Sequence, residues 1–181
     1  MSLPTAQGGP EGVHPVEPRQ FLANVPLFAD ALDQEQLAFL AAQSRPAFFR
    51  AETRLMSQGS FGGSMFVIVK GEVGVNFVDE HGREQAVATL GPPEVVGEMS
   101  LFTGDRRKAT VVAVTNVDAI EITKWSLERV FAKAPELVDK FARVLARRQA
   151  ELNQLSGVPA AGSREAFVNQ ARKVFAGIFG R

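Results

Sequence analysis

The sequence predicts a mainly β domain, an antiparallel sandwich or barrel, with helices before and after it. Residues 47–122 consist of short runs rich in Val, Ile, Phe and Thr, and glycines separate these runs. On both sides of this region, apolar residues recur at spacings of three and four, which indicates helices. The chain has 181 residues, of which 45% are hydrophobic. This is enough to bury a core, and it excludes a disordered chain.

The composition excludes several kinds of chemistry. The chain has no cysteine, and its two histidines are His14 and His81. A disulfide framework, a thiolate nucleophile and a zinc site made of Cys or several His residues are therefore excluded. The sequence also shows no paired acids, Ser-His-Asp set or P-loop. We therefore expect no catalytic residues, no metal and no cofactor, and the protein is predicted not to be an enzyme.

The charges balance overall but differ along the chain. The formal net charge is zero, so the whole protein does not attract nucleic acid or anionic lipid. Residues 1–142 carry 13 basic and 18 acidic side chains, whereas residues 143–181 carry 7 and 2. We interpret the basic tail as a solvated helix face, with a membrane or polyanion contact as the alternative.

The chain is expected to be cytoplasmic. No apolar run reaches the length of a membrane span, and the N-terminal residues lack the apolar region of a secretory signal. A chain excised from the cytosolic part of an inner-membrane protein would show the same features.

The order of elements follows from local patterns. Residues 1–20 are rich in Pro and Gly and are predicted to be a flexible linker or an expression remnant. Residues 21–43 indicate short helices, with Asp33 as an N-cap and Gln36 completing a capping box. The best strand candidates are residues 65–69, 73–78, 85–90 and 110–114, with His81-Gly82 as a hairpin turn between the second and third.

The helical period returns after residue 122. Thr123 is a suitable N-cap, and an apolar stripe that includes Trp125 stops before Pro135. Its spacing predicts that Trp125 is a helix-packing residue rather than a platform for base stacking. A longer helix follows Pro135. Residues 156–163 are predicted to be a linker, and residues 164–179 a short amphipathic helix with a basic opposite face.

Residues 97–111 contain the pattern with a chemical implication. They place a Gly-Glu step at the end of a strand, then one helical turn, and then an arginine that leads into the next strand. A helix N-terminus behind a glycine can bind a phosphate, and Arg107 could add charge-assisted bonds. Glu98 could accept hydrogen bonds from a pair of sugar hydroxyls.

This segment resembles the phosphate-binding cassette of the cyclic nucleotide-binding domain, Gly-Glu-x-Ala/Ser-Leu followed by Pro-Arg-Ala/Ser-Ala-Thr-Val. The corresponding residues here are Gly97-Glu98-Met99-Ser100-Leu101 and Arg106-Arg107-Lys108-Ala109-Thr110-Val111. The resemblance extends upstream through Gln58-Gly59, the strand at residues 63–69 and Gly71-Glu72-Val73. It covers residues 21–155 and is more specific than an isolated glycine-rich loop.

The resemblance implies an α+β fold built on an eight-stranded antiparallel β-roll, a jelly-roll-like double-stranded β-helix. Helices precede it and lid helices follow it, within one domain of residues 21–155. The implied ligand is cAMP or cGMP, with Arg107 on the cyclic phosphate and Glu98 on the ribose 2′-hydroxyl. The predicted ligand-binding set is Gly97, Glu98, Met99, Ser100, Arg107, Lys108, Ala109 and Thr110, with Arg147 and Arg148 as candidate lid contacts.

Three departures from the family pattern bear on this interpretation. Arg106 stands where the family has Pro, Lys108 stands where it has a small residue, and Pro92-Pro93-Glu94 replaces a Pro-Gly-Asp turn. In related domains, a Thr directly after the arginine favours cGMP. Its absence here favours cAMP.

The resemblance further implies a sensor that regulates an attached effector. We expect a bacterial membrane channel of the cyclic nucleotide-gated or small-conductance mechanosensitive type, with transmembrane segments before residue 1 as the discriminating feature. The first alternative is the sensor piece of a Crp/Fnr-type regulator that lacks its DNA-binding domain, because the 26 residues after Leu155 are too few for such a domain. No nucleic-acid partner is therefore expected. The second is a docking or oligomerisation module without a ligand. A homo-oligomer is compatible with all three.

Overall fold

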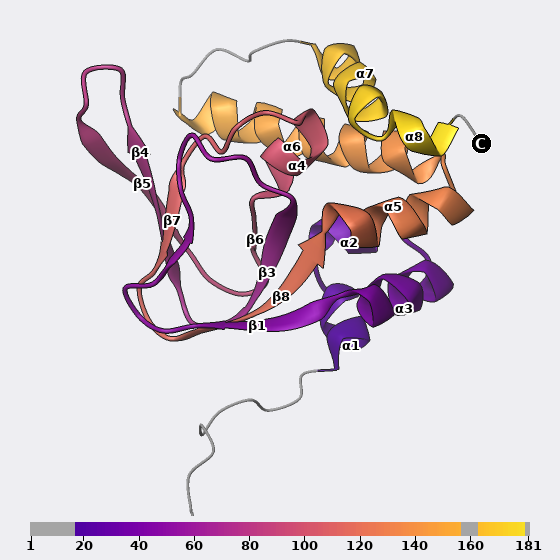
Figure 1. The fold of residues 1–181 in the computed structure, drawn as a ribbon, viewed down its shortest axis with the longest axis horizontal. Helices are drawn as coiled ribbons and strands as arrows, with labels where there is room; N and C mark the ends of the chain where they lie inside the picture. The colour runs from indigo at the N-terminus through magenta and orange to yellow at the C-terminus, as the bar shows by residue number, and fades with distance from the viewer. Residues whose placement is uncertain (1–16, 157–162, 180–181) are drawn as a thin grey trace, which may run out of the picture.

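Two four-stranded antiparallel sheets form a β-roll (Figure 1) in the computed structural model, which describes residues 17–156 and 163–179. The first sheet has the order β1-β8-β3-β6 and the second the order β2-β7-β4-β5. The predicted eight-stranded antiparallel β-roll is confirmed. The strands are β1 (Arg45–Phe49), β2 (Arg54–Met56), β3 (Ser64–Lys70), β4 (Val73–Val78), β5 (Glu84–Leu90), β6 (Val95–Val96), β7 (Thr110–Ala113) and β8 (Val117–Thr123).

The helices gather on one side of the roll (Figure 1), and their caps follow the sequence. They are α1 (Pro18–Leu22), α2 (Pro26–Ala29), α3 (Gln34–Gln43), α4 (Glu98–Thr103), α5 (Lys124–Lys133), α6 (Leu137–Ser156), α7 (Arg164–Val174) and α8 (Ala176–Phe179). The capping box is confirmed, because Gln36 N donates to Asp33 Oδ1 at 2.8 Å and Asp33 N donates to Gln36 Oε1 at 3.0 Å. Thr123 Oγ1 likewise accepts a hydrogen bond from Ser126 N at 3.0 Å.

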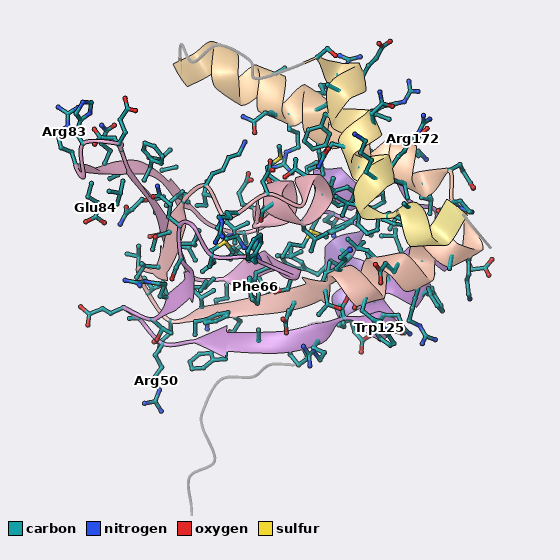
Figure 2. All side chains as sticks on the ribbon, turned by 45° about the horizontal axis from the view of Figure 1, so that its top comes forward. Arg50, Phe66, Arg83, Glu84, Trp125 and Arg172 are labelled. Atoms are coloured by element: carbon teal, nitrogen blue, oxygen red, sulfur yellow. The ribbon has the colours of Figure 1, made fainter. Side chains whose placement is uncertain are left out.

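The four predicted strands correspond to β3, β4, β5 and β7, with ends that differ by at most one residue. The predicted turn between β4 and β5 is also present, because Asp79 Oδ1 accepts hydrogen bonds from the backbone N–H groups of His81 and Arg83. This hairpin projects from the roll, and Arg83 and Glu84 lie toward its tip (Figures 1 and 2).

The molecule has two apolar cores. A smaller core lies between the two sheets and includes Phe66, Ile68 and Val111. A larger core lies where the helices cover the first sheet. Its centre is an aromatic cluster to which α2, α4, α5, α6 and the end of α7 each contribute one ring, and neighbouring ring centroids are 5.1 to 6.1 Å apart. The members are Phe28, Phe102, Phe131, Phe141 and Phe175.

The C-terminal helix differs from the prediction. The sequence predicts one helix over residues 164–179, but the helix is interrupted at Phe175, the C-cap of α7. The ring of Phe175 is buried in the aromatic cluster. The residue that ends α7 is thus also a residue of the core. The N-terminal linker prediction also ends too late, since α1 begins at Pro18. Residues 1–16 and 157–162 of the two predicted linkers lie outside the described residues.

The prediction for Trp125 is wrong. Its side chain is 57% exposed, and the guanidinium of Arg129 lies over its ring, 4.8 Å from the ring centroid. Leu127, Val130 and Phe131 form the buried face of α5. Two residues before Leu127, Trp125 lies about 200° around the helix, which turns it away from this face.

Among the described residues, none of the helices combines the length and the apolar character needed to cross a bilayer.

Candidate functional site

The predicted cassette folds as a short helix between two glycines. Gly97 is the N-cap of α4 with φ of 87°, and Gly104 is the C-cap with φ of 74°. Both values lie in the left-handed region that glycine tolerates. A Cβ on Gly97 would also lie 2.5 Å from Nη1 of Arg107 and 2.9 Å from Cε of Met56. Gly97 therefore allows the chain to turn sharply, and it leaves room for the guanidinium of Arg107 next to the backbone of Gly97.

Arg107 joins the cassette to the roll. Its guanidinium Nη1 donates to Gly97 O at 2.5 Å and to Ser100 Oγ at 2.7 Å, and Nη2 donates to Ser64 O at the start of β3. The residue is 5% exposed. Burial lowers the pKa of Arg107, and nearby Glu98 opposes this shift. An arginine remains charged despite such a shift, so a positive charge is held beneath α4.

Gly62 makes room for this arginine. A Cβ on Gly62 would lie 2.0 Å from Nε of Arg107, whereas a Cβ on Gly63 would meet no atom within 4 Å. The loop before β3 is also tied to the arginine backbone, because Gly59 N donates to Arg107 O and Arg107 N donates to Ser60 O, both at 2.8 Å. The position of Arg107 thus depends on a glycine that the sequence pattern did not single out.

Glu98, the first residue of α4, is half-buried on the wall of the site. Desolvation raises its pKa, and the backbone N–H of Glu98 itself, Arg148 and Arg107 act in the opposite direction, while Glu94 adds to the rise. A desolvated carboxylate is costly unless it receives hydrogen bonds. The site therefore presents an acceptor that donor groups of a ligand would stabilise.

A cavity of about 190 Å³ lies between the cassette and the inside of the roll. The structure brings Gly97, Glu98, Met99, Ser100, Arg107, Lys108 and Ala109 together around it. Sequence reasoning missed most of the apolar wall, which is contributed by Met56, Val75, Leu90, Val95 and Val96, with Val111 beneath. Alternation along the strands would have identified Val75, but β2 and β6 were too short to predict.

The remaining cassette residues have different surroundings. Thr110 does not line the cavity, and its Oγ1 accepts a hydrogen bond from Gln58 N at 3.0 Å. Lys108 is exposed at the cavity edge. Arg106, which stands where the family pattern has Pro, donates to Gly59 O at 2.8 Å and lies 4.2 Å from the ring centroid of Phe61. Thr110 and Arg106 both hold the loop before β3.

The candidate lid residues lie beside the cavity rather than in its wall. Arg147 and Arg148 line a separate hollow of about 550 Å³ between α2, α6 and the turn that precedes β6. Arg148 Nη2 is 3.3 Å from Oε2 of Glu94 in this turn. The turn is formed despite Pro93, since Glu94 N donates to Gly91 O at 2.9 Å. In this structure α6 thus contacts the rim of the site through an ion pair.

Residues 46–134 match the family whose description is the cyclic nucleotide-binding domain, and this match contains α4, Glu98 and Arg107. The chain belongs to the cyclic nucleotide-binding domain family. The regulatory domains of this family bind ligands, and the roll, the cassette helix and the lid helix have the arrangement that the sequence resemblance predicted.

Relatives of this cyclic nucleotide-binding domain have different effectors. The chain is 28% identical over 134 residues to a CRP-like cAMP-activated global transcriptional regulator of Mycobacterium tuberculosis, covering 74% of this chain and 59% of that protein. It is 32% identical over 130 residues to a cyclic nucleotide-gated potassium channel of Rhizobium etli, covering 72% of this chain and 35% of the channel. The chain thus spans only part of these relatives.

A solved structure is also similar to this cyclic nucleotide-binding domain. The N-terminal domain of a transcriptional regulator from Streptomyces coelicolor is 34% identical, with a TM-score of 0.63, covering 79% of this chain and 99% of that one. The similarity therefore extends over almost the whole of that domain.

Replacing Gly62 tests the packing of Arg107. We expect Gly62→Ala to destabilise this cyclic nucleotide-binding domain by about 1–3 kcal/mol, because the new methyl would displace the guanidinium. Gly63→Ala is the matched control and should leave stability within about 0.5 kcal/mol of the parent. Urea unfolding followed by circular dichroism measures both. Equal effects of the two substitutions would contradict this account of Arg107.

Glu98 should make stability depend on pH. Because its pKa in the folded state is raised above the ordinary value of 4.5, its favourable contribution is complete below that value and is lost as pH rises through the raised pKa. Glu98→Gln should therefore be more stable than the parent at pH 7, and this advantage should shrink toward pH 4. Thermal unfolding across this range measures the difference. A difference that is the same at every pH would show that the charge of Glu98 is not its source.

Proposed function

We propose that this chain is a regulatory domain that binds a cyclic nucleotide, cAMP in preference to cGMP, in the cavity beside α4. Binding moves the lid helix α6, and this movement biases an attached effector. The observation that carries the proposal is that Arg107 and Glu98 line the same cavity. They bring a buried cation and a carboxyl group with a raised pKa to one site.

Arg107 suits the cyclic phosphate. The residue is held in place by bonds to Gly97 O, Ser100 Oγ and Ser64 O, and a guanidinium has more N–H donors than these three bonds use. Charge-assisted bonds to a phosphate are among the strong polar contacts, and the attraction between the two charges increases where water is excluded. A fixed arginine also loses little side-chain entropy on binding.

Glu98 suits the ribose. A hydroxyl group is a donor that can satisfy a desolvated carboxylate without bringing a second negative charge into the site. The apolar wall formed by Val75, Leu90 and Val95 is suited to the uncharged part of a nucleotide. The preference for cAMP rests on Lys108, which stands where a cGMP-selective relative would carry Thr.

The ion pair between Arg148 and Glu94 supports a role for α6 in signalling. It joins the lid helix to the turn that immediately precedes β6 and the cassette. A ligand that changes the environment of Glu98 also acts on Arg148, because the two charges interact. Nucleotide binding and the position of α6 would thus be linked through a small set of charges.

The effector we propose is a bacterial membrane channel, supported by the likeness to the Rhizobium etli channel. A DNA-binding regulator is the second candidate, and the likeness to the Streptomyces coelicolor domain favours it. The sequence of the encoding gene on both sides of this chain distinguishes them. The channel predicts apolar spans of about 20 residues upstream. A helix-turn-helix domain downstream, with no such spans, would overturn the channel proposal.

Comparing cAMP with adenosine tests the role of Arg107 separately from folding. Adenosine shares the purine and ribose but lacks the phosphate, so the ratio of the two affinities reports the phosphate contact. We expect the parent to bind cAMP saturably, and Arg107→Lys to reduce the ratio by roughly 10- to 100-fold, because one or more charge-assisted bonds are lost. Isothermal calorimetry measures both ligands with both proteins.

The control is Arg50→Lys, the same substitution at an exposed arginine that does not line the cavity. We expect it to change the ratio much less than Arg107→Lys does. An unchanged ratio in Arg107→Lys would contradict the phosphate assignment. If the folded parent gave no binding heat with millimolar cAMP or cGMP, the roll would instead be a docking or oligomerisation module.

A further inference from the structure

Helix α7 contacts the far end of the cassette helix. Gln170 Nε2 donates to the backbone carbonyl of Thr103, the last residue of α4, at 2.7 Å. Next to this bond, a methyl group on Gly104 would come within 3.1 Å of Cγ2 of Val174. The helix after the lid thus touches the element that carries the predicted nucleotide-binding residues (Figure 1).

The same helix ends in the aromatic cluster. The ring of Phe175 lies 5.3 Å from that of Phe102, and both side chains are fully buried. On its other side, Phe102 stacks against Phe141 of α6 at 5.8 Å with an angle of 8° between the rings. Because such an interior is close-packed, α4 cannot shift without displacing a ring of α6 or α7.

Helix α7 is also bound to the lid. Arg172 Nε donates to Asp139 Oδ1 of α6 at 2.7 Å, and Arg172 Nη2 donates to Asp139 Oδ2 (Figure 2 labels Arg172 on α7). This two-point contact fixes orientation as well as distance. Helix α7 therefore links the lid helix and the cassette helix, which carry different parts of the proposed response.

We propose that α7 is a positioning element of the nucleotide site, with Gln170 and Phe175 as its positioning residues. It holds α4 in the orientation that presents Glu98 and Ser100 to the cavity, so the docking of α7 and the binding of a cyclic nucleotide favour each other. This inference rests on the proposed function. Helix α4 has six residues and is about 9 Å long, so it moves as one piece, and a constraint at Thr103 also fixes its first turn.

The coupling must act in both directions. If docked α7 increases the affinity for nucleotide by a given factor, bound nucleotide increases the docking of α7 by the same factor. A purely structural role for α7 would change stability but would not make its docking respond to ligand. Ligand-dependent protection of α7 from hydrogen exchange is therefore the distinguishing measurement.

The test compares Gln170→Ala with Asn169→Ala in the full chain. Asn169 is an exposed amide on the same helix, so its replacement controls for loss of an amide side chain. We expect Gln170→Ala to weaken cAMP binding roughly three- to tenfold, the range for loss of one hydrogen bond, and Asn169→Ala to bind like the parent. In the parent, cAMP should slow hydrogen exchange in α7, and it should do so less in Gln170→Ala.

Two results would overturn the inference. One is parent-like cAMP affinity in Gln170→Ala, and the other is cAMP binding that leaves hydrogen exchange in α7 unchanged. A parent that binds no cyclic nucleotide would refute the proposed function and the coupling to nucleotide with it. In that case, exchange of the α4 amides in ligand-free Gln170→Ala and Asn169→Ala would still decide whether α7 positions α4.

Discussion

The bonds of the buried Arg107 guanidinium are the interaction on which the site depends. They connect the carbonyl that precedes α4, a hydroxyl within α4 and the first residue of β3. These bonds attach both ends of the first turn of α4 to the roll through one side chain. Without them, each acceptor would lose a strong donor in a place with little water, which is costly. The arginine is thus part of the structure of the domain as well as the proposed phosphate ligand.

A second constraint acts on the opposite side of α4. Phe102 is packed among rings from three other helical segments, and this packing joins the cassette to α5, α6 and the end of α7. One face of the short helix therefore lies toward the cavity and the other toward the helical layer. A change in the position of α4 would act directly on the C-terminal helices, because Phe102 contacts the rings of Phe141 and Phe175. This arrangement fits a sensor whose output is a movement of helices.

The sequence predicted much of this arrangement, and the reasons differ between elements. The caps at Asp33 and Thr123 and the hairpin turn at His81-Gly82 are local, so short-range patterns were sufficient. Strands β2 and β6 have three and two residues, and a period cannot be recognised over so few positions. In β1, Pro46 argues against a strand, and the structure accommodates it because β1 lies at a sheet edge. The resemblance identified the cassette residues, but not Gly62 or the apolar cavity wall.

Other features depend on contacts between distant segments. The break at Phe175 and the docking of α7 require α4, α5 and α6 to be in place, and no spacing within residues 164–179 indicates them. For Trp125, the spacing predicted a packed side chain, whereas the structure shows an exposed one. Its place near the apolar stripe of α5 assigned it to the wrong face of the helix. In both cases local periodicity predicted the element but not its partner.

The most direct test of the account is nuclear magnetic resonance of the ¹⁵N-labelled chain titrated with cAMP and, separately, with adenosine. The account predicts that cAMP shifts the amide signals of Glu98, Ser100 and Ala109 and the Nε–H signal of Arg107. Adenosine should leave the Arg107 signal unchanged. Shifts confined to the hollow beside Arg147, with none at these four groups, would contradict the assignment of the nucleotide site to the cavity beside α4.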